Sequence, residues 1–148
     1  MYSRSIIELE DKLHLKEQKL GSMHPDVAES LAQLAHACFV CQRYVEAESL
    51  FWRAVMIRSQ IFGQEDLGVA HLLAELARLY EIQEQFDEAE RLFRLAYAIK
   101  SSGLGPGHLE TLAAARAVVT VCRRQGKHIP EAELERLIRV SSQSSFVI

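Results

Sequence analysis

The chain repeats itself every 42 residues, and this repeat limits what it can fold into more than any other feature. Residues 21–62 and 63–104 are identical at about fifteen aligned positions. Most of the identical residues recur at the three- and four-residue spacing of helices and fall into two groups. The first group is Val27, Ala28, Leu31, Leu34 and Ala35, which align with Val69, Ala70, Leu73, Leu76 and Ala77. The second is Glu46, Ala47, Glu48, Leu50, Phe51, Ala54 and Ile57, which align with Glu88, Ala89, Glu90, Leu92, Phe93, Ala96 and Ile99. Such a repeat predicts a helical solenoid. Solenoids present extended surfaces, which favours binding over catalysis.

Glycine and proline mark where the helices should change. Gly21 and Pro25 enclose one turn, Gly63 and Gly68 the next, and residues 103–107 the third. We therefore predict an all-α fold of antiparallel helix pairs, with about seven helices at about 4–19, 26–41, 44–61, 67–83, 86–101, 109–125 and 130–140. The predicted organisation is an N-terminal half-repeat or capping helix (1–20), two repeats (21–62 and 63–104), a degenerate third repeat or C-terminal cap (105–140) and a flexible tail (141–148).

Composition narrows the classes of partner. The formal net charge is only −3, so nothing indicates a nucleic-acid partner or a charged membrane surface. No run approaches the roughly 20 apolar residues that span a bilayer, and the charged segment 1–19 does not have the pattern of a signal peptide. The three cysteines form no disulfide framework. We expect a cytoplasmic protein, with a cytoskeletal or ciliary setting left open.

No catalytic or cofactor site is predicted. Gly103–Gly107 lacks the preceding strand of a phosphate loop and is expected to be a turn. Cys38 and Cys41 have metal-ligand spacing but no second pair to complete a site. Cys38 and Cys122 share the repeat position of Tyr80, which indicates core thiols. The histidines are dispersed, and the sequence therefore predicts a protein that is not an enzyme and holds no cofactor or metal.

The repeat resembles the tetratricopeptide repeat. The residues that carry the resemblance are Leu31, Leu34-Ala35, Tyr44, Ala47, Phe51 and Ala54, and then Leu73, Leu76-Ala77, Tyr80, Phe86, Ala89, Phe93 and Ala96. Small alanines let two helices approach closely, while Leu, Tyr and Phe fill the gaps between them. The 42-residue spacing, with Leu20-Gly21 before His24-Pro25 and Leu104-Gly105-Pro106 before His108, is similar to that of kinesin light chains. The resemblance covers about residues 20–127.

The resemblance implies a groove lined by the first helix of each pair. Carried over by position, this groove would contain Glu29, Gln33 and His36, then His71, Glu75 and Arg78, then Arg116, Thr120 and Arg123. It lacks the Lys/Asn clamp that binds chaperone carboxyl termini, and Gln33, Glu75 and Ala117 replace the groove asparagines of kinesin light chains. Its charge changes from acidic to basic, which predicts an acidic peptide near Arg116 and Arg123. A solvated polar face is the alternative.

A second surface emerges when the two clear repeats are compared. Val45, Trp52 and Met56, with Ser49, lie off the core stripe of their helix, where the next repeat carries Asp87, Arg94, Ala98 and Arg91. Trp and Met are enriched at interface centres, so this outer face is predicted to bind another protein. Coverage by the N-terminal helix or by the tail is the alternative. The end Phe146-Val147-Ile148 fits either a strand-adding motif for PDZ-type domains or chance.

Two functions follow. The first is a non-enzymatic adaptor or scaffold that binds proteins or peptides through the groove or the outer face. The second is an architectural subunit built permanently into a larger cytoskeletal or ciliary assembly. The half-repeat at 1–20 also suits a fragment or isoform of a longer repeat protein.

Overall fold

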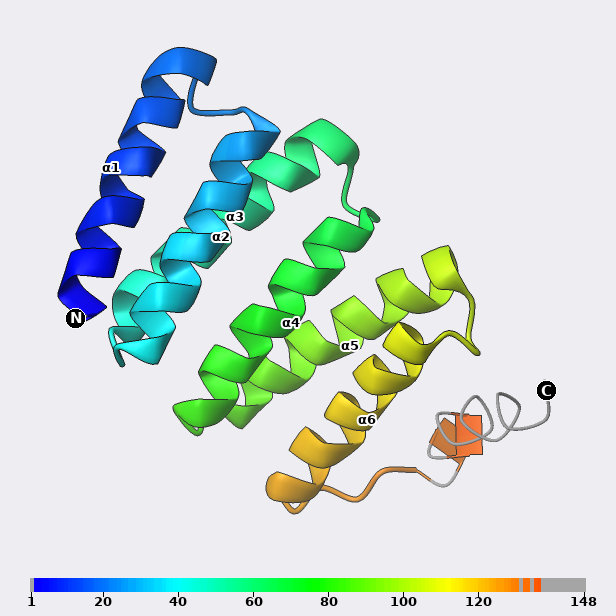
Figure 1. The fold of residues 1–148 in the computed structure, drawn as a ribbon. Helices are drawn as coiled ribbons and strands as arrows, with labels where there is room; N and C mark the ends of the chain where they lie inside the picture. Colours follow the sequence, from blue (N-terminus) through cyan, green and yellow to red (C-terminus); the bar gives the residue numbers. More distant parts are fainter. Residues whose placement is uncertain (1, 131, 134, 137–148) are drawn as a thin grey trace. The chain divides into compact units, whose positions relative to one another are not determined.

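The computed structural model describes residues 2–130, 132–133 and 135–136. Its helices are α1 (Tyr2–Leu20), α2 (Pro25–Val40), α3 (Tyr44–Phe62), α4 (Leu67–Ile82), α5 (Phe86–Leu104) and α6 (Leu109–Arg124), as Figure 1 shows. No strand occurs in the described part of the chain, and the predicted all-α fold of helix pairs is confirmed. Of the predicted seventh helix, residues 132–133 and 135–136 are helical. The predicted tail at 141–148 lies outside the described residues.

The helices follow the 42-residue period of the sequence. α1, α3 and α5 each have 19 residues and begin at residues 2, 44 and 86. α2, α4 and α6 each have 16 residues and begin at residues 25, 67 and 109. α1 therefore has the length and the phase of the second helix of a pair, as its half-repeat sequence predicts.

Each first helix begins at a side-chain cap on the same repeat position. The Nδ1 atom of His24 accepts a hydrogen bond of 3.1 Å from the backbone N–H of Asp26, and His108 caps α6 in the same way. At the equivalent position before α4, the Oδ2 atom of Asp66 accepts one of 3.1 Å from the Val69 N–H. These bonds satisfy helix N–H groups that would otherwise lack a partner. The two histidines thus have the same structural role at equivalent repeat positions.

Each pair turns through a left-handed residue at the same repeat position. Gln42, Glu84 and Gly126 have φ of 61°, 61° and 68°. In the first of these turns the N–H of Arg43 donates to the carbonyl of Cys38 over 2.8 Å, which is the bond of a Schellman helix end. One boundary differs from the sequence prediction: Gly103 lies inside α5, because that helix runs to Leu104 as the 42-residue period requires.

The chain divides into two compact units, residues 1–72 and 73–148. In the first unit α2 packs against α3 through the two stripes predicted from the repeat, with Val27, Ala28, Leu31, Leu34, Ala35 and Cys38 facing Ala47, Phe51, Ala54 and Ile57, all at most 3% exposed. α1 packs on α2 and buries Ile6 and Leu13, while Leu9 is half-buried. α1 is therefore amphipathic, with its buried apolar side chains on one face.

In the second unit α5 packs against α6. The side chains buried in this unit include Ala89, Leu92, Phe93, Ala96 and Ile99 of α5 and Leu112, Ala115, Val118, Val121 and Cys122 of α6. Cys38, Tyr80 and Cys122 are all buried, as their shared repeat position predicts. Burial raises the pKa of both the Cys38 and the Cys122 thiol. These cysteines are therefore packed as neutral core residues.

Candidate protein-binding surfaces

In the first unit, the predicted groove residues of α2 lie on its solvent side. Glu29, Gln33 and His36 are exposed, and His71 is exposed in the first turns of α4. A pocket opens between the beginnings of these two helices, and it brings Glu29 and His71 together. The pocket is lined by Pro25, Asp26, Ala28, Glu29, Ala32, Arg58, Gly68, His71 and Leu72.

Arg58 reaches this pocket from α3. Its Nε atom donates a hydrogen bond of 2.9 Å to the Asp66 carboxylate, and its guanidinium lies 4.6 Å from the centre of the Phe62 ring. The guanidinium passes directly over Gly68, where an added Cβ atom would come within 2.2 Å of Arg58 Nε. Glycine at residue 68 is therefore what lets this side chain cross the start of α4. The sequence pattern placed Gly68 at the edge of a turn and gave no sign of this role.

Small side chains make the pocket hollow, and carboxylates lie at its edge. Ala28 and Ala32 of α2 and Leu72 of α4 supply apolar lining, whereas Asp26 and Glu29 are exposed. The residue types suit the aliphatic part of a peptide side chain with a polar end.

In the second unit, Glu75 and Arg78 of α4 pair with each other at 2.6 Å. Arg116, Thr120 and Arg123 of α6 are exposed. The Thr120 hydroxyl donates to the backbone carbonyl of Arg116 over 2.8 Å. Arg116 and Arg123 make no ion pair with any residue that the structure describes.

The repeat period refines the predicted groove on α6. Thr120 follows His36 by two periods and lies on the same helix row. Arg116 follows Ala32 and Arg123 follows Phe39, so these arginines belong to a neighbouring row of the helix. The residues that correspond to Glu29 and Gln33 are alanines. A groove built from equivalent repeat positions therefore carries fewer charged side chains on α6 than the resemblance implied.

The predicted outer face of α3 is exposed. Val45 is 80% exposed, Met56 60% and Trp52 37%. Trp52 is thus partly buried and partly accessible to solvent. The binding role of these three residues stays a prediction.

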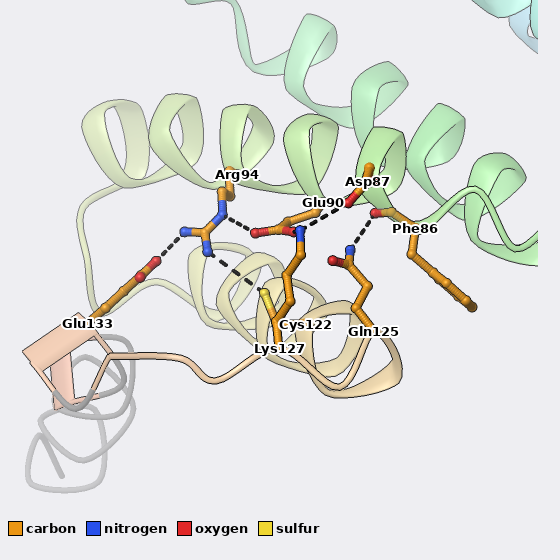
Figure 2. Close-up of polar contacts among 8 residues, drawn as sticks. All are labelled: Phe86, Asp87, Glu90, Arg94, Cys122, Gln125, Lys127 and Glu133. Carbon is orange, nitrogen blue, oxygen red and sulfur yellow. Dashed lines mark hydrogen bonds and ion pairs between the residues drawn. The ribbon is translucent and has the colours of Figure 1, made fainter.

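At the corresponding face of α5, the structure forms a cluster of ion pairs that sequence analysis did not find (Figure 2). Arg94 donates through Nε to Glu90 over 2.9 Å and also pairs with Glu133, while Lys127 contacts Asp87 at 3.0 Å and Glu90 at 2.9 Å. The sequence did contain a hint of this cluster, because the charged residues Asp87 and Arg94 replace Val45 and Trp52 at this face. Apart from Glu90 and Arg94, which are four residues apart on α5, the partners are 37 to 40 residues apart in sequence, so only the fold identifies them.

Glu90 is the most perturbed acid of this cluster. Burial raises the pKa of its carboxyl group, but hydrogen bonds from Lys127 and Arg94 outweigh that effect and lower the pKa to about 2. Only 13% of the Glu90 side chain is exposed. The cluster therefore joins α5 to the segment after α6 with permanently ionised groups.

A second depression lies beside this cluster. It is lined by Glu84, Phe86, Asp87, Arg124, Gln125 and Lys127. Gln125 donates to the Phe86 carbonyl over 2.8 Å, and the Arg124 guanidinium lies 5.0 Å from the centre of the Phe86 ring. These polar groups serve internal contacts. Among the described residues, no group of His, Cys, Asp or Glu side chains is arranged to hold a metal ion, and no helix has the length and apolar character to cross a membrane.

Comparison with known proteins gives one family. The model of the tetratricopeptide repeat matches residues 26–102. No curated protein matches the chain.

Many solved structures are similar to this chain, and three of them illustrate the shared fold. The nearly identical TPR-like repeats of a Podosopora anserina protein described as a kinesin light chain are 23% identical, with a TM-score of 0.79 over 98% of this chain. A single-substitution variant of that protein is 25% identical, with a TM-score of 0.76 over 95%. BtubC (BKLC) from P. vanneervenii is 18% identical, with a TM-score of 0.85 over 99%. The chain spans 69%, 66% and 59% of the lengths of these structures.

Proposed function

Because this chain belongs to the tetratricopeptide repeat family, we propose that it is a non-enzymatic scaffold that binds partner peptides in the pocket between the beginnings of α2 and α4. Tetratricopeptide repeats serve in general as protein–protein interaction scaffolds and are typically not catalytic. The observation that carries the proposal is the pocket itself, which is bounded by two first helices and includes Glu29 and His71.

The chemistry of the pocket supports a peptide ligand. Peptide binding needs apolar contact together with a few placed polar groups. Ala28, Ala32 and Leu72 supply the apolar contact, and Asp26 and His71 are among the polar groups. The pocket is open to solvent and not an enclosed cavity, which suits a side chain of an extended segment better than an enclosed small molecule.

The test is to select displayed random peptides on the full chain and to measure the affinity of the selected peptides for Ala32→Arg. An arginine at this position fills the pocket, and α6 carries Arg116 at the equivalent position, so the substitution is compatible with the helix. We expect binding to weaken at least about tenfold. Gln60→Arg, at an exposed position of α3, is the matched control and should bind normally.

Recovery of no peptide, or equal binding to Ala32→Arg and to the unaltered chain, would overturn the proposal. Circular dichroism of each variant confirms that a loss of binding does not come from unfolding. A wider role as a cytoplasmic or cytoskeletal adaptor is a proposal at the same level, supported by the likeness to structures described as kinesin light chains.

The outer face supports a second candidate, an architectural subunit of a larger assembly. Val45 and Met56 expose 80% and 60% of their surface on one side of α3, and a large exposed apolar surface commonly marks a contact. Trp52→Glu should abolish association with such an assembly while leaving helicity unchanged. Full association of the variant, or its unfolding, would contradict this candidate.

A further inference from the structure

The pocket between α2 and α4 carries negative charge at its edge. Asp26 and Glu29 are both exposed and both line it. The positive charge of Arg58 is already matched, because its Nε atom lies 2.9 Å from the Asp66 carboxylate. The other ionisable groups that line the pocket are the two carboxylates and the His71 imidazole. An arriving cation is attracted and an arriving anion is repelled.

The lining fits the stem of a long basic side chain. Ala28, Ala32 and Leu72 present methyl and methylene groups to the same pocket that the two carboxylates line. Lysine and arginine combine an aliphatic stem with a charged end, and they bury the stem along apolar surface while the end stays hydrated. A side chain that enters along Ala32 would place its charged end beside Asp26 or Glu29.

The pair of carboxylates occurs in the first repeat. One period later, the positions of Asp26 and Glu29 are occupied by Gly68 and His71, and two periods later by Glu110 and Ala113. The repeat fold therefore does not require both acidic residues.

We infer that this pocket recognises a lysine or arginine side chain of the partner peptide. The stem packs against Ala28, Ala32 and Leu72, and the cationic end pairs with Asp26 and Glu29. This inference rests on the proposed function, because it names the chemistry of the ligand at the same pocket. It makes the first repeat selective for a basic residue within the bound segment.

The test is a nuclear magnetic resonance titration of the full, isotope-labelled chain with three short peptides. The probes are acetyl-Ala-Lys-Ala-amide and its analogues with norleucine or glutamate in place of lysine. Norleucine keeps the stem of lysine and removes its charge. We expect the lysine peptide to shift the amide signals of Gly68, Ala28 and Ala32 in a saturable way, and the other two peptides to shift them at least about tenfold less at equal concentration.

The variant Asp26→Asn/Glu29→Gln should weaken lysine-peptide binding by about tenfold, and added salt should weaken binding to the unaltered chain. The matched control Glu10→Gln/Glu65→Gln removes two exposed carboxylates that do not line the pocket and should bind normally. Equal shifts with norleucine would overturn the inference and leave the proposed function standing. A stronger effect of glutamate, or no shift at these amides, would also overturn it, while the peptide selection separately decides the proposed function.

Discussion

Thr111 of α6 occupies the buried repeat position that Val69 occupies in α4, but the Thr111 hydroxyl has no hydrogen-bond partner within the described part of the chain. Val27 occupies the same position in α2, and all three side chains are at most 3% exposed. A core position shaped for valine thus contains a buried polar atom. Such an atom destabilises the fold, because it loses its hydrogen bonds to water on folding.

Thr111→Val should therefore raise the free energy of unfolding by about 1 kcal/mol, since valine has nearly the same shape and removes the unsatisfied hydroxyl. Urea unfolding followed by circular dichroism measures the change. Thr120→Val is the matched control, because Thr120 is exposed and its hydroxyl is bonded, and its effect should stay within about 0.5 kcal/mol. A destabilised Thr111→Val would show that the hydroxyl is satisfied.

Glu90→Gln should destabilise the chain at pH 7 by about 1–3 kcal/mol, because the ionised carboxylate is what Lys127 and Arg94 hold. The folded-state pKa of Glu90, about 2, lies below its ordinary value of 4.5. The carboxylate therefore contributes its full stability above about pH 4.5, and the contribution is lost as the pH falls towards 2.

The measurement is urea unfolding of both proteins between pH 7 and pH 3. The stability difference between them should narrow below about pH 4.5. Glu88→Gln is the control on the same helix, because Glu88 is half exposed and pairs only loosely with Arg91 at 3.8 Å. A difference that stays constant with pH would mean that Glu90 acts through packing alone.

The sequence was sufficient to predict the helix pairs and their core, because a repeat exposes both through its own periodicity. Leu31 and Phe51 recur 42 residues later on the same stripes, and both are buried. The extension of α5 through Gly103 was not predicted, because the local glycine content argued for a turn, although the 42-residue period carries the helix to Leu104. The low helix propensity of glycine was overridden at Gly103 by the tertiary context of the repeat.

The pocket and the ion-pair cluster could not be predicted in the same way. The pocket depends on Arg58 lying across Gly68, and no pattern in a single sequence shows that a side chain crosses a neighbouring helix. The cluster joins Arg94 to Glu133 across a loop where the repeat becomes irregular. Equivalence between repeats predicts what the repeats share, while candidate binding features arise where they differ.

Gln42→Gly should stabilise the chain by about 0.5–1 kcal/mol. Gln42 has a φ of 61°, which costs a side-chain-bearing residue about 1 kcal/mol that glycine does not incur. The third turn already carries Gly126 at this position, with a φ of 68° and no atom near its missing Cβ. Gly126→Ala should therefore destabilise by about 1 kcal/mol through backbone strain alone. Thermal unfolding of both variants should show a higher melting temperature for Gln42→Gly and a lower one for Gly126→Ala. A change in the same direction for both would contradict the explanation.

Asp66 has two roles that substitutions can separate. Its Oδ2 atom caps α4 through the Val69 N–H at 3.1 Å and also accepts the Arg58 Nε–H at 2.9 Å. Asp66→Asn keeps a capping oxygen and removes the charge, so it should cost about 0.5–1 kcal/mol. Asp66→Ala removes both interactions and should cost about 1–2 kcal/mol.

His24→Ala provides the comparison, because His24 caps α2 in the same way but has no Arg58 partner. Its loss should cost less than that of Asp66. Urea unfolding at neutral pH ranks the three variants. Equal losses of stability for Asp66→Asn and Asp66→Ala would mean that the cap contributes nothing. The ion pair with Arg58 alone would then hold the start of α4.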